Sequence, residues 1–255
     1  MNSKRLMRIF LVAVVLSPSV SLADTVTIRA DSWFPINGEP EGDNAGYMID
    51  LAVKIFGDAG HTVDYRLAPW ERAVADVRKG KYDCVVGAYK EDAPDFVYPE
   101  ESWGLDESAF FVKKGEVWKY TDLGSIENVK LGLVGGYAYG EDFDAYVKAH
   151  NKGSYQFVKG DNALEKNIKK LLGGRITATI ESPLVMNSSL KGMGIQGKIV
   201  EAGMLGEPSD MYIACSPAKK GSKDLVRLVD EGTKRLRSSG ELKAILDKYG
   251  LSDWK

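Results

Sequence analysis

Apolar and polar positions along this chain follow two periodicities in turn, which predicts alternating strands and helices. Residues 26–30 alternate apolar and polar side chains as a half-buried strand does, whereas residues 47–56 repeat apolar side chains on one helical face. A second strand is predicted at residues 62–67, and Pro69 begins another amphipathic helix. This alternation is typical of an α/β protein.

One pattern of helix, glycine, basic residue and apolar strand occurs twice. Residues 70–88 carry it around Gly80, and residues 164–182 repeat it around Gly174. In each copy the glycine ends the helix so that the next strand can run back into a sheet. We therefore expect two similar α/β lobes. Open α/β sheets bind ligands beyond the carboxyl ends of their strands, so two facing lobes predict a binding cleft.

Two basic turns predict where the chain crosses between the lobes. The first, residues 113–115, follows an extended apolar segment, and the second, residues 217–221, follows the apolar segment 211–215. We predict that residues 24–112 and 210–255 form lobe 1 and residues 113–209 form lobe 2. Two amphipathic helices at the end of the chain are expected to pack on lobe 1. Two crossing strands would allow the lobes to close around a ligand.

The N-terminus has the features of a secretory signal peptide. Lys4, Arg5 and Arg8 precede an apolar run at residues 9–16, and the small residue Ala23 stands at a cleavage position. We predict cleavage after Ala23 and a periplasmic location. The alternative, a buried N-terminal helix, explains the ordered combination of these features less well. The apolar run is shorter than the roughly 20 residues of a membrane-spanning helix.

Composition narrows the class of function. The 255-residue chain carries a net charge of −2, with acidic and basic residues interspersed, which gives no electrostatic basis for binding nucleic acid. Cys84 and Cys215 each lie in an apolar segment, and the sequence leaves open whether they pair or remain buried thiols. We find no metal-ligand spacing and no cofactor motif, since residues 173–175 are typical of a helix end.

Side chains at predicted strand ends are the first binding candidates. Trp33 follows the first strand, Tyr89 follows the strand of the first repeat, and Glu181 ends the strand of the second. Tyr137 and Tyr139 lie in a glycine-rich turn before a helix, where free backbone N–H groups favour an anion. For each of them, packing or surface exposure is the alternative interpretation.

Four further residues are candidates from their place around the predicted cleft. Trp70 and Arg72 begin a helix, and Arg72 is a candidate to clamp an anion. Asp92 and Trp103 belong to a polar, proline-containing stretch expected over the cleft mouth. Phe34, one step beyond Trp33, is expected to face the core. A packing or surface role is the alternative for all four candidates.

With these segments in order, the chain resembles the periplasmic solute-binding proteins of the amino-acid-binding type, the ABC transporter substrate-binding proteins of family 3. The resemblance is carried by GYMIDL at residues 46–51, by Trp70 with GKYD at residues 80–83, and by LDKYG at residues 246–250. It covers essentially the whole mature chain. It implies two α/β lobes joined by two hinge strands, the type II periplasmic binding protein fold, which closes around a small polar solute.

The resemblance also marks two departures near the ligand. Amino-acid binders of this family clamp the ligand carboxylate with an Arg after the third strand, whereas here the loop is shorter and Asp92 stands nearest that position. Glu181 occupies a place where relatives often carry an Asp that binds the ligand ammonium. Both acids favour a ligand with a positive group, an amino acid or a related amine or zwitterion. Arg72 and the glycine-rich turn leave room for an anionic group.

The resemblance implies a monomeric extracytoplasmic receptor that delivers its solute to an ABC permease. Such a receptor performs no catalysis and needs no cofactor or metal. One alternative is a sensor whose closed form docks on a signalling receptor. Another is a dehydratase-like enzyme on the same fold, which is disfavoured because His61 and His150 fall outside the predicted cleft.

Overall fold

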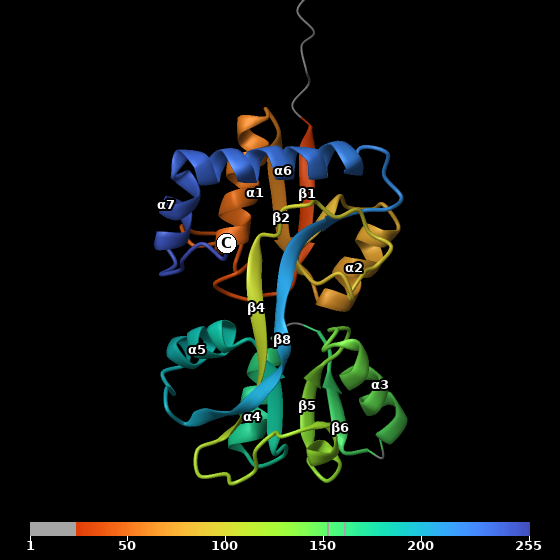
Figure 1. Ribbon diagram of the computed structural model, residues 1–255, viewed down its shortest axis with the longest axis vertical. Helices are drawn as coiled ribbons and strands as arrows, with labels where there is room; N and C mark the ends of the chain where they lie inside the picture. Colours follow the sequence, from red (N-terminus) through yellow and green to blue (C-terminus); the bar gives the residue numbers. More distant parts are fainter. Residues whose placement is uncertain (1–23, 152, 161) are drawn as a thin grey trace, which may run out of the picture.

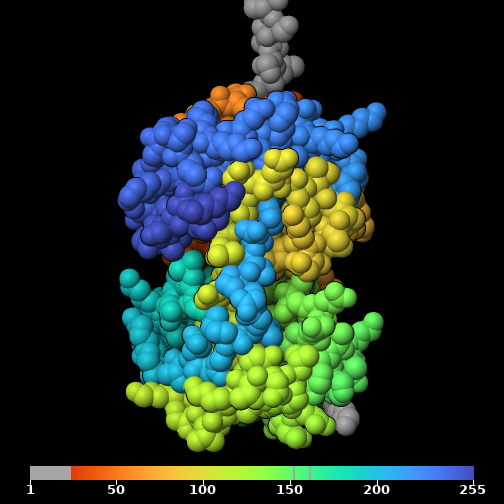
Figure 2. Space-filling model, viewed as in Figure 1, coloured from red at the N-terminus to blue at the C-terminus, as the bar shows by residue number. Residues whose placement is uncertain are grey.

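The computed structural model describes residues 24–151, 153–160 and 162–255, so the predicted signal peptide lies outside the described residues. Two α/β halves are stacked along the long axis of the molecule, and two long strands run between them (Figure 1). The space-filling view in Figure 2 shows these strands, yellow and light blue, crossing the surface between the upper and lower halves. No helix of the described chain is long and apolar enough to span a membrane.

The strands of the described chain form one eight-stranded sheet. From either edge inward, the first three strands are the second, the first and the third strand of that half in chain order. The order is β2-β1-β3-β8-β4-β7-β5-β6. The upper half contributes β1 (Thr25–Ala30), β2 (Thr62–Leu67) and β3 (Cys84–Ala88), and the lower half contributes β5 (Leu131–Val134), β6 (Tyr155–Val158) and β7 (Ala178–Glu181). The strands within each set of three are parallel. This shared arrangement is the structural form of the sequence repeat.

Helices connect and cover these strands. Those of the upper half are α1 (Tyr47–Asp58), α2 (Trp70–Arg78), α6 (Ser222–Ser239) and α7 (Glu241–Asp247). Those of the lower half are the 3-10 turn η1 (Leu123–Ile126), α3 (Glu141–His150), α4 (Ala163–Leu172) and α5 (Pro183–Gly192). In both repeats a glycine with positive φ, Gly80 at 76° and Gly174 at 68°, ends the turn after the helix. The closing helices α6 and α7 pack on α1, as predicted from their apolar stripes.

The two halves are joined by β4 (Gly104–Lys113) and β8 (Ile199–Cys215), which pair with each other in antiparallel register. β8 pairs with β3 in the upper half, and β4 pairs with β7 in the lower half. The sequence predicted the extended segments at 108–113 and 211–215 but not the rest of either strand. Residues 206–210 of β8 are exposed, so they carry no apolar signal. The division of the lobes at 112/113 and 209/210 stays a prediction.

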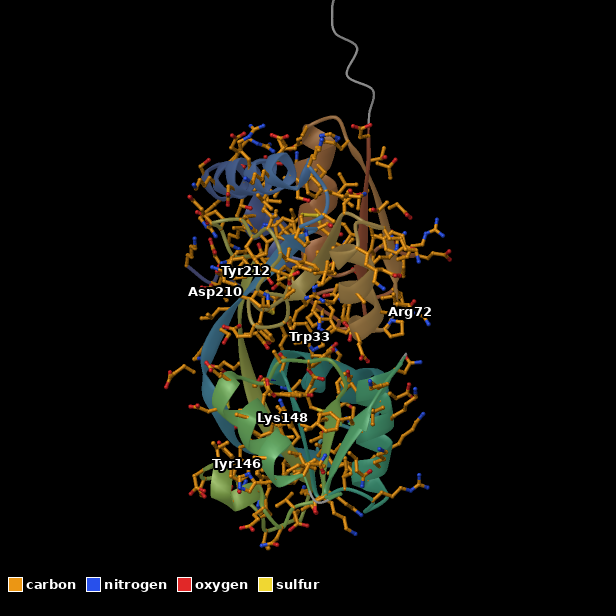
Figure 3. All side chains as sticks on the ribbon, turned by 90° about the vertical axis from the view of Figure 1, so that its right-hand side faces the viewer. Trp33, Arg72, Tyr146, Lys148, Asp210 and Tyr212 are labelled. Carbon is orange, nitrogen blue, oxygen red and sulfur yellow. A yellow bond between two sulfur atoms is a disulfide. The ribbon has the colours of Figure 1, made fainter. Side chains whose placement is uncertain are left out.

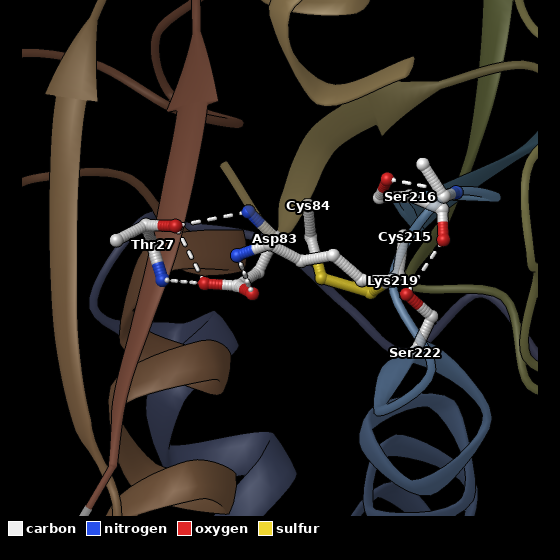
Figure 4. The surroundings of a disulfide bond; sticks show 8 residues. Thr27, Asp83, Cys84, Cys215, Ser216, Lys219 and Ser222 are labelled. Carbon is white, nitrogen blue, oxygen red and sulfur yellow. Dashed lines mark hydrogen bonds and ion pairs between the residues drawn. A yellow bond between two sulfur atoms is a disulfide. The ribbon is translucent and has the colours of Figure 1, made fainter. Parts of the chain in front are cut away.

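A disulfide fixes β8 to the upper sheet. Cys84 of β3 lies directly opposite Cys215 of β8, and the two are bonded with their Cα atoms 4.0 Å apart. Beside the bond, Asp83 accepts hydrogen bonds from Thr27 on β1 and forms an ion pair with Lys219 at 2.6 Å (Figure 4). The structure therefore answers the question that the sequence left open, because it makes the two cysteine-bearing strands neighbours.

Removing this cross-link should lower the free energy of unfolding by about 2–5 kcal/mol, since the bond closes a loop with a sequence separation of 131 residues. The test is urea denaturation of a C84A/C215A variant, followed by circular dichroism. Wild-type protein treated with dithiothreitol is the matched control and should move in the same direction. A loss below about 1 kcal/mol in both samples would contradict a stabilising role.

Candidate functional site

A cavity lies between the two halves, beyond the carboxyl ends of strands from both. Asp31 and Trp33 follow β1, Tyr89 follows β3, Tyr137 lies in the turn after β5, and Glu181 ends β7. Figure 3 shows Trp33 where the two halves meet. The full lining is Asp31, Trp33, Trp70, Val86, Gly87, Tyr89, Asp92, Ser108, Tyr137, Ala138, Tyr139, Ile180, Glu181 and Ser182. The cavity volume is about 20 Å³, room for about one water, so a larger solute can enter only if the halves separate or the side chains rotate.

Hydrogen bonds across the cavity hold the two halves together. The indole N–H of Trp33 donates to Glu181 Oε1 at 2.6 Å, and the Tyr137 hydroxyl donates to Asp31 Oδ2 at 2.6 Å. The backbone N–H of Ala138 donates to an Asp92 oxygen at 3.0 Å. Each of these bonds joins an acid to a donor from the opposite half. The acids therefore lie on the surfaces that a closing movement brings together.

Burial strongly perturbs Glu181. The residue is 4% exposed, and the loss of solvation raises the pKa of its carboxyl group to about 8 despite the hydrogen bonds from Trp33 and the Ser182 N–H. Its second oxygen, Oε2, has no hydrogen-bond partner among the described residues. A buried carboxylate without a partner is costly, so this atom marks a place for a donor that the protein itself does not supply.

Three more acids surround the same space. Desolvation raises the pKa of Asp31 to about 6 and that of Asp92 to about 7, although both accept hydrogen bonds across the cavity. Asp106 on β4 lies beside the cavity, accepts hydrogen bonds from Tyr89 and Ser182, and has a pKa raised to about 6 by burial. No Lys, Arg or His lines the cavity among the described residues. The site is acidic without a cationic partner.

Aromatic rings form the rest of the wall. Trp33 meets Tyr89 and Tyr137 edge-on, with ring centroids 6.3 and 6.4 Å apart, and Trp70 meets Tyr137 at 6.4 Å. Tyr139 lies against Tyr137 with centroids 6.2 Å apart. Ring faces combined with carboxylates attract organic cations, because the ring quadrupole and the negative charge act in the same sense. The described chain contains no group of three or more His, Cys, Asp or Glu residues arranged to hold a metal ion.

The structure brings most of the predicted residues to this cavity. Seven of the nine line it: Trp33, Trp70, Tyr89, Asp92, Tyr137, Tyr139 and Glu181. Arg72 does not. Its exposed side chain lines a neighbouring hollow together with Lys159 and Gly135, and Figure 3 shows it at the edge of the upper half. Contact between these seven residues and a ligand stays a prediction.

Trp103 lies in the upper core instead of at the cleft. It is fully buried, and its indole N–H donates to Thr233 Oγ1 on α6 at 2.8 Å. Phe34, expected in the core, is 37% exposed and packs edge-on against Tyr249. The tight turn that bonds Trp33 N–H to Asn37 O turns Phe34 outward, because it breaks the strand alternation on which the prediction relied.

The glycine-rich turn also differs from the prediction. Its N–H groups were expected to be free for an anion, but Ala138 N–H donates to Asp92 and Tyr139 N–H donates to Asp144 at 3.1 Å. Protein carboxylates thus occupy two of the donors that this turn could offer to an anion.

Sequence reasoning missed Asp31 and Asp106. Asp31 is two residues before Trp33, and side chains two residues apart lie on the same side of an extended segment. This spacing could have predicted Asp31 at the site. Asp106 is a charged residue inside a strand, and no periodicity distinguishes it from its exposed neighbours, because the side chains that contact it, Tyr89 and Ser182, come from distant parts of the sequence. Only the three-dimensional arrangement shows that it is buried.

The structure has the type II fold of two-lobed solute-binding proteins. It has parallel strands in each half, two strands that cross between the halves, and a cavity where the halves meet. Residues 26–252 match the profile of the bacterial extracellular solute-binding proteins, family 3. The chain belongs to this family, as its sequence motifs indicated. No curated protein matches the sequence.

Solved structures show the same fold. A substrate-binding protein of an ABC uptake transporter from Streptococcus pneumoniae, with bound histidine, is 22% identical with a TM-score of 0.74, over 89% of this chain and 92% of its own. The arginine-, lysine-, histidine-binding protein ArtJ from Geobacillus stearothermophilus is 21% identical with a TM-score of 0.73, over 89% and 95%. A histidine kinase sensor domain with similarity to periplasmic binding proteins is 17% identical with a TM-score of 0.73, over 90% and 98%.

Ionisation of Glu181 should destabilise the protein in the absence of solute as pH rises. Its folded-state pKa of about 8 lies above the unfolded value, so the folded chain holds the extra proton and stability falls between about pH 4.5 and 8. An E181Q variant should lose less stability over this window, by up to about 1.4 kcal/mol per pH unit. Urea denaturation at pH 5, 6.5 and 8 measures the difference. E201Q, a change at an exposed position on β8, is the control and should parallel the wild type; a parallel E181Q profile would refute the role of Glu181.

Proposed function

We propose that this protein is an extracytoplasmic receptor that closes on a small polar solute with a positive group and delivers it to an ABC permease. The unpartnered Oε2 of buried Glu181 carries the proposal, because it faces a cavity lined by acids and aromatic rings and by no basic side chain among the described residues. A bound cation supplies the missing partner. It also favours the ionised form of the surrounding acids, and the two halves then close on a neutralised site.

The comparisons support this class of ligand. The similar structures include receptors named for binding histidine, and for binding arginine, lysine and histidine. All of these ligands carry an amine. Their identity to this chain is low, so the ligand class rests on the cavity's own charge.

We also propose that the protein is exported to the periplasm. The predicted signal peptide at residues 1–23 and the extracellular character of the family both support a periplasmic location. Delivery of a solute to an import permease requires a location outside the cytoplasm.

A sensor is the second candidate function, since a histidine kinase sensor domain has the same fold. The same cavity would serve it. The difference lies in the outer surface that meets the partner, so pull-down with a permease or with a kinase ectodomain distinguishes the two roles.

We propose that the protein binds its solute without catalysing a reaction on it. His61 lies in the turn between α1 and β2, and His150 at the end of α3 stacks on Tyr146 with ring centroids 4.1 Å apart. Figure 3 shows Tyr146 in the lower half, away from Trp33. Neither histidine lines the cavity, which leaves the acids as the remaining proton-transfer groups. Incubation with each bound solute and a search for product by mass spectrometry tests this part.

A thermal-shift screen against amino acids, amines, organic acids and short peptides should show stabilisation by cationic solutes and none by anionic ones. For the best solute, the E181Q variant should bind at least tenfold more weakly by isothermal titration calorimetry, because it removes the charge that pairs with the cation. That change corresponds to about 1.4 kcal/mol.

The exposed-site variant E201Q is again the matched control and should bind as the wild type does. Unchanged affinity in E181Q would remove Glu181 from the site. Stabilisation by organic acids alone would contradict the proposed class of ligand.

A further inference from the structure

A second hollow adjoins the cavity and is also acidic. Its volume is about 300 Å³, and its charged lining residues are Glu91, Asp106, Glu141 and Glu207. No Lys, Arg or His lines it among the described residues. We call this hollow the vestibule. Lys90, adjacent to Glu91 in the sequence, is directed away, since its ammonium lies over the Tyr212 ring at 4.9 Å from the centroid.

The vestibule and the cavity adjoin each other at shared lining residues. Tyr89, Ser108, Ala138 and Tyr139 line both. Asp106 lines the vestibule, while its two hydrogen-bond donors, the Tyr89 hydroxyl at 2.7 Å and the Ser182 hydroxyl at 2.6 Å, line the cavity. The partition between the two spaces is therefore made of side chains that a bound molecule can displace. A molecule with one end at Glu181 can extend past Asp106 into the vestibule.

The neighbourhood offers little to a ligand carboxylate. The N–H groups of Ala138 and Tyr139 already donate to Asp92 and Asp144. The exposed side chain of Arg72 lines a different hollow, which adjoins the cavity at Asp31 and Trp70, and the Lys159 ammonium in that hollow is paired with Glu71. The indole N–H of Trp70, which lines the cavity, has no hydrogen-bond partner among the described residues, but it is a single neutral donor and lies near Asp92, whose pKa it lowers. An α-carboxylate placed in the cavity would lie beside Asp31, Asp92 and Glu181 and would find one free neutral donor, Trp70; ionised carboxylates at short range repel.

We infer that the solute is an elongated organic cation with a positively charged nitrogen at each end and no carboxylate. This inference rests on the proposed function and names its ligand class. One nitrogen donates to Glu181 Oε2, the buried oxygen without a partner, and lies among the rings of Trp33 and Tyr137. The other lies in the vestibule with Glu141 and Glu207. An alkyl spacer passes between Tyr89 and Tyr139, whose rings cover apolar chain well.

The first test compares each amino acid with the amine that lacks its carboxylate. Isothermal titration calorimetry on the full protein measures agmatine against arginine and cadaverine against lysine. We expect the amine of each pair to bind at least tenfold more tightly, because it leaves out the repelled carboxylate. Equal or tighter binding by the amino acids overturns the inference and leaves the proposed function in place.

The second test isolates the vestibule charge. Cadaverine should bind at least tenfold more tightly than 1-aminopentane, which has the same chain and one amine. An E141Q/E207Q variant should reduce the affinity for cadaverine and leave that for 1-aminopentane within twofold. E127Q/E201Q is the matched control at exposed positions outside both spaces and should change neither.

Equal affinity for the two amines, or an equal loss for both in E141Q/E207Q, overturns the inference. Failure of agmatine and cadaverine to bind overturns it as well. The proposed function fails with it only if the wider thermal-shift screen also finds no cationic solute that stabilises the protein.

Discussion

Four acids meet in the closed site with no Lys, Arg or His among the described residues that line the cavity, and the proposed binding of a cation depends on this constraint. Glu181, Asp106, Asp31 and Asp92 meet where the two halves close, and burial raises the pKa of each. Removing a carboxylate from water costs several kcal/mol unless a charge or donors compensate. The halves can therefore stay closed over these groups in two ways, with the acids protonated or with a cation between them. The second way couples closure to the ligand.

The fold supplies the geometry of this coupling. The disulfide and the pairing with β3 fix the end of β8 to the upper half, while β4 carries Asp106 from the upper half toward the lower one. The contacts across the cavity are a few hydrogen bonds and the edge-on ring contacts of Tyr137 with Trp33 and Trp70, and the exposed Lys159–Glu71 ion pair lies beside them. Each has a net contribution on the order of 1 kcal/mol. Separation of the halves is therefore inexpensive, and a solute that replaces these bonds and neutralises the acids can shift the balance toward closure.

The sequence allowed the architecture and much of the cavity to be predicted, for identifiable reasons. Helix and strand periodicities with Gly80 and Gly174 indicated the repeat, and strand ends indicated Trp33, Tyr89 and Glu181. Local patterns failed where long-range pairing decides burial. Asp106 is buried where Tyr89 and Ser182, both distant in the sequence, donate hydrogen bonds to it. Trp103 is in the core because α6 covers it.

The orientation of side chains and N–H groups at helix starts and turns was equally hard to predict. Arg72 begins a helix at the cleft edge, but the helix turns its side chain toward a separate hollow. Two N–H groups expected to be free in the glycine-rich turn are bonded: Tyr139 N–H to the nearby Asp144 in α3, and Ala138 N–H to Asp92, which is 46 residues away. Hydrogen bonds between distant residues leave no periodic trace in a sequence.

The carboxyl pKa of Glu181 in the absence of solute tests the burial of these acids most directly. Carbon-13 NMR of protein labelled at the glutamate side-chain carboxyl measures it, with E181Q to assign the resonance. Burial in the cavity predicts titration near pH 8. Titration near the ordinary value of about 4.3 would show a hydrated carboxylate and would contradict the proposed basis of cation binding.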